Sequence, residues 1–115
     1  MTEFMMIFRT EKMDNTGQTP EDMQAIMQVW QDWIGGIAAQ GKFVSTNSLN
    51  PIGKTITADG VITNGPYAEV KEIVGGYILV KADDLEDAIS LSEGCPILAI
   101  PTGKVEVRGI TVFDN

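Results

Sequence analysis

The chain has 115 residues, 43% of them apolar and 21% charged, a balance typical of one globular domain with a sizeable core. Sixteen acidic residues against eight basic ones give a net charge of -8, and the basic residues form no run. This argues against nucleic-acid or anionic-membrane binding, because both need clustered cations. No apolar run approaches the roughly 20 residues of a membrane-spanning helix. The segment Met1 to Thr10 lacks the basic start and cleavage site of a signal peptide, so we expect a cytoplasmic protein.

The residue types present restrict the possible chemistry. There is no histidine, and Cys95 is the single cysteine, so the chain cannot form an internal disulfide. Ser-His-Asp and Cys-His systems and histidine-ligated zinc or haem sites cannot be built within it. We expect no metal and no cofactor, and any chemistry must use carboxylates, Lys, Arg, Tyr, Ser, Thr or main-chain groups.

The first part of the chain predicts a strand followed by a long helix. Residues 3–10 are almost continuously apolar, as expected of a strand covered on both faces. Thr19 and Pro20 form a helix start, with Thr as the N-cap and Pro at the first helical position, and the helix runs to about residue 40. Its apolar residues recur every three or four positions and predict one buried face: Met23, Ile26, Met27, Trp30, Trp33, Ile34, Ile37 and Ala38.

A meander of short strands follows. Residues 42–49 and 54–58 have strand character, and Asp59-Gly60 forms a hairpin turn into residues 61–63. Asn64-Gly65-Pro66 turns the chain again, and residues 68–72 predict a short helical turn.

The last part of the chain predicts strand, helix and strand. Residues 73–82 form a strand, Asp83 caps a helix that runs to Ser92, and residues 95–102 form a loop. In this helix the residues expected to point inward are Leu85, Ala88, Ile89 and Leu91. The apolar phase changes within the final strand, residues 104–113, which predicts a bulge at Gly109.

This order of elements predicts a single domain, residues 1–115, with an α+β ferredoxin-like sandwich fold: an antiparallel sheet with two helices on one face. The other face has no cover within the chain. Residues 4–8 and 77–80 are nevertheless apolar on both faces, so we expect a second copy to cover the sheet in a homodimer.

Several blocks of the sequence resemble the YCII-related family, specifically its DGPF-type members. The blocks follow the order and spacing of that family: Asn64-Gly65-Pro66-Tyr67-Ala68-Glu69-Val70-Lys71-Glu72, Gly75-Gly76-Tyr77, Asp83-Asp84-Leu85-Glu86-Asp87-Ala88, Cys95-Pro96 and Gly103-Lys104-Val105-Glu106-Val107-Arg108. The resemblance implies a dimeric α+β barrel, in which two ferredoxin-like units face each other through their sheets and each subunit has a cleft between sheet and helices. Two departures matter. The family's Asp-Gly-Pro-Phe is here Asn64-Gly65-Pro66-Tyr67, and the His-Asp pair suggested for some relatives cannot exist in a chain without histidine.

The motif around Tyr67 supplies the first candidate site. Tyr67 is a possible hydrogen-bond donor to a ligand at the mouth of the cleft, although Asn, Gly and Pro are also what a tight turn requires. Glu69, Lys71 and Glu72 follow closely. In an apolar cleft, a carboxylate beside an ammonium group can act as an acid-base pair; on the surface the same residues form salt bridges, which is the interpretation we favour.

The remaining candidates have equally plain structural interpretations. Trp30 either lines a pocket for a flat ligand or, as its helical spacing favours, fills the core. Gly75 and Gly76 allow close approach of a ligand or helix, or form a bulge. Arg108 can clamp a carboxylate if it faces the cleft. The acidic residues Asp83, Asp84, Glu86 and Asp87 suit a helix N-terminus better than a metal site.

Three functions are compatible with these features. The first is a homodimer that binds a small organic molecule in a cleft within each subunit. The second is a cofactor-free enzyme of the isomerase, lyase or monooxygenase type with a Glu-Lys or Tyr acid-base pair, an argument by fold analogy. The third is a protein-interaction module in transcriptional regulation, which a large exposed apolar patch away from the dimer interface would favour.

Overall fold

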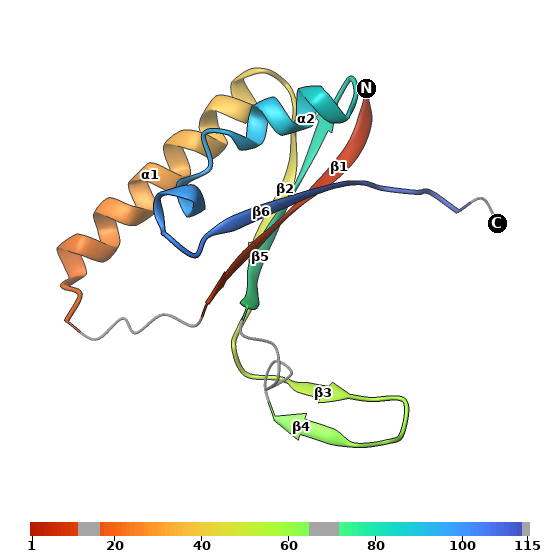
Figure 1. Ribbon diagram of the computed structural model, residues 1–115. Helices are drawn as coiled ribbons and strands as arrows, with labels where there is room; N and C mark the ends of the chain where they lie inside the picture. Colours follow the sequence, from red (N-terminus) through yellow and green to blue (C-terminus); the bar gives the residue numbers. More distant parts are fainter. Residues whose placement is uncertain (12–16, 65–71, 114–115) are drawn as a thin grey trace.

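The computed structural model describes residues 1–11, 17–64 and 72–113 (Figure 1). The elements in chain order are β1 (Thr2–Glu11), α1 (Pro20–Ala39), β2 (Phe43–Ser48), β3 (Lys54–Ile56), β4 (Ile62–Asn64), β5 (Glu72–Ala82), α2 (Leu85–Ser92), the short 3-10 helix η1 (Pro96–Ala99) and β6 (Lys104–Gly109). Within this described part, no helix combines the length and apolar character needed to span a membrane.

The main sheet has four antiparallel strands in the order β2-β5-β1-β6. The helices α1 and α2 lie together on one side of it (Figure 1). This arrangement confirms the predicted α+β sandwich. The predicted meander is interrupted, because β3 and β4 pair only with each other in a separate two-stranded sheet that lies beyond one end of the main sheet.

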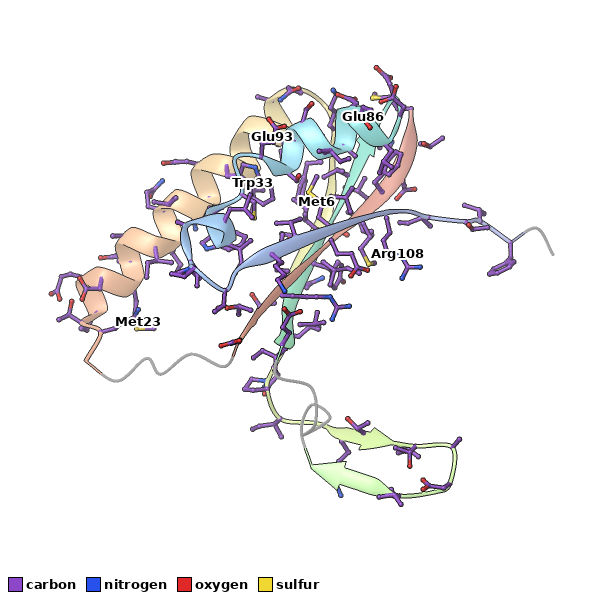
Figure 2. The ribbon with its side chains drawn as sticks, in the orientation of Figure 1. Met6, Met23, Trp33, Glu86, Glu93 and Arg108 are labelled. Atoms are coloured by element: carbon purple, nitrogen blue, oxygen red, sulfur yellow. The ribbon has the colours of Figure 1, made fainter. Side chains whose placement is uncertain are left out.

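The core lies between the main sheet and the helices. Alternate residues of β1 and β5 supply it: Phe4, Met6 and Phe8 from β1, and Ile78, Val80 and Ala82 from β5. Met6 and Ile78 are paired in register and are both completely buried. Figure 2 shows the Met6 side chain in the layer between the strands and the helices. Because successive side chains of a β-strand point to opposite faces, these alternate residues make up the face of the sheet that packs against the helices.

The helix α1 begins as the sequence predicts. The Thr19 hydroxyl accepts a hydrogen bond from the Asp22 N–H at 3.1 Å, and the Asp22 carboxylate accepts one from the Thr19 N–H at 3.1 Å, which makes a capping box. The prediction of one continuously buried face was wrong for its first half. Ile37 is buried and Trp30, Trp33 and Ile34 are half-buried, but Met23, Ile26, Met27 and the small Ala38 are exposed. Met23, Ile26 and Met27 are exposed because the first turns of α1 extend past the edge of the sheet (Figures 1 and 2).

The N-cap of α2 is one residue later than predicted. Asp84, not Asp83, is the cap, and its carboxylate accepts the Asp87 N–H at 2.8 Å. Leu85 is exposed, against the prediction, while Ala88 is fully buried as predicted. Asp83 instead donates its main-chain N–H to the Asp87 carboxylate at 3.0 Å.

The predicted bulge at Gly109 was also wrong. The register between β1 and β6 is continuous from Arg9 opposite Lys104 to Phe4 opposite Gly109, where the strand ends. The Ile110 N–H still donates to the Glu3 carbonyl at 3.1 Å, and the chain leaves the sheet after that, which accounts for the change of apolar phase. The register shifts of the main sheet lie elsewhere, opposite the step from Phe8 to Arg9 and within β2 between Phe43 and Ser45.

Candidate functional site

A cavity of about 520 Å³ lies between α1 and the β2–β5 edge of the sheet. Its apolar lining comes from β1, α1 and η1: Phe8, Met27, Trp30, Ile34 and Ile97. The strands β2 and β5 complete it with Thr46, Asn47, Ser48, Gly75 and Gly76. Pockets for small molecules are typically about 300–1,000 Å³ and mostly apolar with few polar groups, so the size and lining fit that class.

Aromatic rings form one wall of the cavity. The Phe8 and Trp30 ring centroids are 5.1 Å apart and edge-to-face, and Trp33 lies 5.8 Å from Trp30 and 6.0 Å from Phe8. Trp33 is held in place because its Nε1–H donates to the Leu91 carbonyl at 3.0 Å. Trp30 therefore packs against the core, as its helical spacing favours, and also lines the cavity.

Main chain at Gly75 and Gly76 forms another part of the wall. Phe8 pairs with Gly76 and Arg9 with Val74, so Gly75 is the extra residue of a β-bulge. A Cβ at Gly76 would lie 2.7 Å from the Asn47 carbonyl oxygen, whereas a Cβ at Gly75 would meet no atom within 4 Å. Gly75 thus makes the bulge, and Gly76 permits the close approach of β2 rather than of a helix.

The polar groups of the cavity come from β2. The Thr46 hydroxyl donates to the Tyr77 carbonyl at 2.8 Å and keeps its acceptor capacity. Asn47 donates from Nδ2 to the Tyr77 hydroxyl at 3.0 Å, on the other face of the sheet, so it meets the cavity through its main chain. The Ser48 hydroxyl has no hydrogen-bond partner among the described residues. The described lining contains no ionisable side chain.

The predicted site residues divide into three groups. Trp30, Gly75 and Gly76 come together at the cavity. Glu72 and Arg108 do not line it, since both lie on the opposite side of the sheet (Figure 2 for Arg108). Asn64 is the last residue of β4, and Gly65, Pro66, Tyr67, Glu69 and Lys71 lie outside the described residues, as does most of the helical turn predicted for residues 68–72.

Sequence reasoning missed Thr46 and Ser48. Both fall on the helix side of β2, since their partners there are Ile78 and Gly76. They share the helix side with Phe43 only because the register of β2 shifts between Phe43 and Ser45, and simple alternation along the sequence does not predict this shift.

The side of the sheet away from the helices, which we call the open face, has an apolar centre. Met5 and Ile7 of β1 lie in register with Leu79 and Tyr77 of β5, and all four are half-buried. Ion pairs surround this centre: Glu72 with Lys104, Arg9 with Glu106 at 3.2 Å, and Arg108 with Glu106 at 3.8 Å.

The open face is electrically neutral. The strand registers place four basic and four acidic residues on it: Arg9, Lys81, Lys104, Arg108, Glu3, Glu11, Glu72 and Glu106. The net charge of -8 is therefore carried entirely by the rest of the chain.

Two further chemical groups are structural. Cys95 is buried, and this burial raises the pKa of its thiol to about 11, which leaves it protonated and unreactive at neutral pH. The Asp83 N–H and the Lys42 ammonium bond to Asp87 and lower its pKa. Asp87 thereby ties the start of α2 to Lys42 beside β2. Within the described ranges, no group of three or more acidic or cysteine side chains could hold a metal ion.

The four-stranded sheet, its two helices and the cavity beneath α1 define an α+β protein of the ferredoxin-like class. The chain belongs to the YCII-related domain family, whose family model matches residues 3–114.

The individual proteins similar to it include the following two. One is a protein of Rhizobium meliloti (strain 1021) described as uncharacterised, 24% identical over 87 residues, which span 66% of this chain and 70% of that protein. The other is the solved structure of 5-chloro-2-hydroxyhydroquinone dehydrochlorinase (TftG) from Burkholderia phenoliruptrix AC1100, in complex with 2,5-dihydroxybenzoquinone. That structure superimposes with a TM-score of 0.51 over 94% of this chain and 93% of its own, at 15% identity, which establishes similarity of fold.

Proposed function

We propose that this protein binds a small, uncharged, ring-shaped organic molecule in the cavity beneath α1. The observation that carries the proposal is the cavity itself: about 520 Å³, walled by Phe8 and Trp30, with the Thr46 and Ser48 hydroxyls as its polar groups. An apolar pocket with a few polar groups to orient the ligand is the usual form of a small-molecule site.

The lining indicates the character of the ligand. Aromatic side chains and the main chain at Gly75 and Gly76 offer flat surfaces to a planar ring. A charged ligand would lose its hydration without gaining an ion pair from the described lining, which is costly. The dehydrochlorinase of similar fold was solved with a single-ring compound, 2,5-dihydroxybenzoquinone, a ligand of this size class.

We also propose that the protein acts in the cytoplasm as a homodimer, with a second copy on the open face, and that it is a DGPF-type member of its family. Met5, Ile7, Tyr77 and Leu79 form an apolar centre with charged residues around it, which is the usual anatomy of a protein interface. Two copies of a neutral face can meet without the repulsion that other surfaces of an acidic chain would cause.

A matched pair of ligands tests the cavity. Benzamide and benzoate have the same ring and nearly the same shape but differ in charge. In calorimetric titrations of the purified protein, we expect benzamide to bind at least about tenfold more tightly than benzoate, equivalent to about 1.4 kcal/mol. Equal affinity for the two, or binding of neither, would refute the proposed ligand class.

A cavity-filling variant locates the binding. Gly75→Leu adds a side chain at a residue that lines the cavity and where an added Cβ would meet no atom within 4 Å. We expect it to abolish benzamide binding. Gly36→Leu is the matched control, since Gly36 lies on α1 with equal free space and does not line the cavity. Binding that survives Gly75→Leu would place the site elsewhere. Catalysis by Tyr67, Glu69 and Lys71 is a separate hypothesis, since these residues lie outside the described part of the chain.

A further inference from the structure

Residues 50–64, which include the β3–β4 hairpin, are called the arm below. The arm carries apolar side chains that nothing in the described chain covers. Ile52, Ile56, Val61 and Ile62 are exposed by 86%, 71%, 52% and 59%. Ile56 and Ile62 are directly opposite each other in the β3–β4 register, so they form one apolar pair on one face of the hairpin. A lone two-stranded hairpin is marginally stable in water, and a third strand or another element packed on its apolar face is needed to stabilise it.

The turn of the arm does not depend on these apolar residues. The Gly60 N–H donates to the Thr57 carbonyl at 3.0 Å, and the Thr57 N–H donates to the Val61 carbonyl at 2.9 Å. Gly60 has a φ of +86°, which suits glycine in a tight turn. Since polar contacts already form the turn, four exposed aliphatic side chains point to packing against something outside the subunit.

The direction of the arm identifies the side on which that partner lies. In Figure 1 the helices lie on the left of the main sheet, while the arm, below the lower end of the sheet, and the segment that follows β6 both extend to the right, away from the helices. That segment is apolar and exposed too, with Val112 at 78% and Phe113 at 84%. Two extensions from distant parts of the sequence therefore project to the side of the uncovered face.

Charge favours a second copy as the occupant. The arm contains one basic and one acidic residue, Lys54 and Asp59, so it is neutral like the open face. The strongly acidic surface of the chain lies elsewhere. A neutral side with exposed apolar groups suits a self-complementary contact between two identical acidic chains.

We propose that the arm packs its Ile56–Ile62 pair against a second copy of this chain seated on the open face, and that residues 110–113 do the same from the other end of the sheet. The inference rests on the proposed homodimer and adds to it the segments that clasp the partner. The two-fold symmetry of such a dimer makes each contact occur twice.

The test is a double variant of the arm. Ile56→Thr combined with Ile62→Thr keeps β-branched side chains, and therefore strand propensity, but removes the apolar surface. In sedimentation experiments over a concentration series, we expect a dimer for the unmodified chain and a dimer dissociation constant about 100-fold higher or more for the variant, because four buried isoleucines per dimer are changed. The control is Ile26→Thr with Val29→Thr, two exposed aliphatic residues on α1, which should leave the constant unchanged.

The outcomes separate the two proposals. If the unmodified chain is a dimer and the arm variant has the same dissociation constant, the proposed arm contact is wrong and the sheet-to-sheet dimer remains. If the unmodified chain is a monomer at every concentration, both proposals are wrong. A second measurement is direct: in a mixture of isotope-labelled and unlabelled chains, the Ile56 and Ile62 methyl groups should show intermolecular nuclear Overhauser effects. Contacts from these methyl groups only within their own chain would contradict the proposal.

Discussion

The two faces of the main sheet are built from the same strands but differ in how deeply their side chains are buried. On the helix side of β1, Phe4, Met6 and Phe8 are exposed by only 7%, 0% and 7%. On the open side of the same strand, Met5 and Ile7 are half-buried and lie among ion pairs. An antiparallel sheet with one wet face normally alternates apolar and polar residues, whereas this one has apolar residues on both faces at its centre.

The difference shows where the fold is complete and where it is not. The helix-side face is covered within the subunit, by α1, α2 and η1. The open face has the residues of a core but no layer above them in the described chain, and the arm and the final segment repeat this pattern with aliphatic groups exposed to solvent. Together these features are the physical basis for the proposed second copy.

The largest expected effect comes from removing one methionine from each face. Met6→Ala leaves a cavity in a fully buried site, so we expect the free energy of unfolding to fall by about 2–5 kcal/mol. Met5→Ala, one residue away on the open face, should cost about 1 kcal/mol or less in dilute protein. Urea unfolding at low and high protein concentration measures both.

Concentration sharpens this comparison. If a second copy covers the open face, the cost of Met5→Ala grows as protein concentration rises, because stability then includes the dimer contact. The cost of Met6→Ala stays the same. Equal costs for the two variants in dilute protein would mean that the two faces do not differ as described.

The order of elements was predictable because each has a local signal. The capping box at Thr19 and Asp22, the continuous apolar character of β1 and the Asp59-Gly60 turn are all read from neighbouring residues, and each is present. The errors arose where a longer-range feature decided the outcome. The bulge is at Gly75 because of how β5 pairs with β1, and the phase change at Gly109 reflects the end of a strand.

The candidate site was predictable only in part for the same reason. Trp30, Gly75 and Gly76 were singled out by residue type, and they do meet at the cavity. Thr46 and Ser48 were not, because their position depends on the register of β2 against β5. Arg108 depends on register too: its partner is Met5, which places it on the open face, away from the cavity.

A smaller effect distinguishes the two adjacent glycines of the cavity wall. Gly76→Ala would bring a Cβ to 2.7 Å from the Asn47 carbonyl oxygen and 3.2 Å from the Ser48 Cα, so β2 must shift. We expect a loss of about 1–3 kcal/mol in the free energy of unfolding and faster amide exchange in β2. Gly75→Ala has free space and should change stability by less than about 1 kcal/mol. Similar losses for both would show that the bulge, not the approach of β2, requires glycine.

The smallest expected effect concerns the polar tie that holds the helix layer to the sheet. The pKa of Asp87 is lowered by the Asp83 N–H and by Lys42, whose Nζ lies 3.1 Å from both carboxylate oxygens. A carboxyl whose folded pKa is lowered stabilises the fold above its unfolded pKa of about 3.9, and this contribution disappears as pH falls through the folded value.

Asp87→Asn should therefore destabilise the protein at pH 7, with a difference from the unmodified chain that shrinks as the pH is lowered from about 4. Urea unfolding across this pH range measures the difference, and Asp32→Asn is a suitable control, because Asp32 is exposed on α1 and bonded only to Gln28 among the described residues. A difference that stayed constant down to the lowest pH would mean that Asp87 acts through packing rather than through its charge. In that case the tie between the helix layer and the sheet would depend on the Trp33 to Leu91 hydrogen bond and the apolar core, and the contrast between the two faces would be one of burial alone.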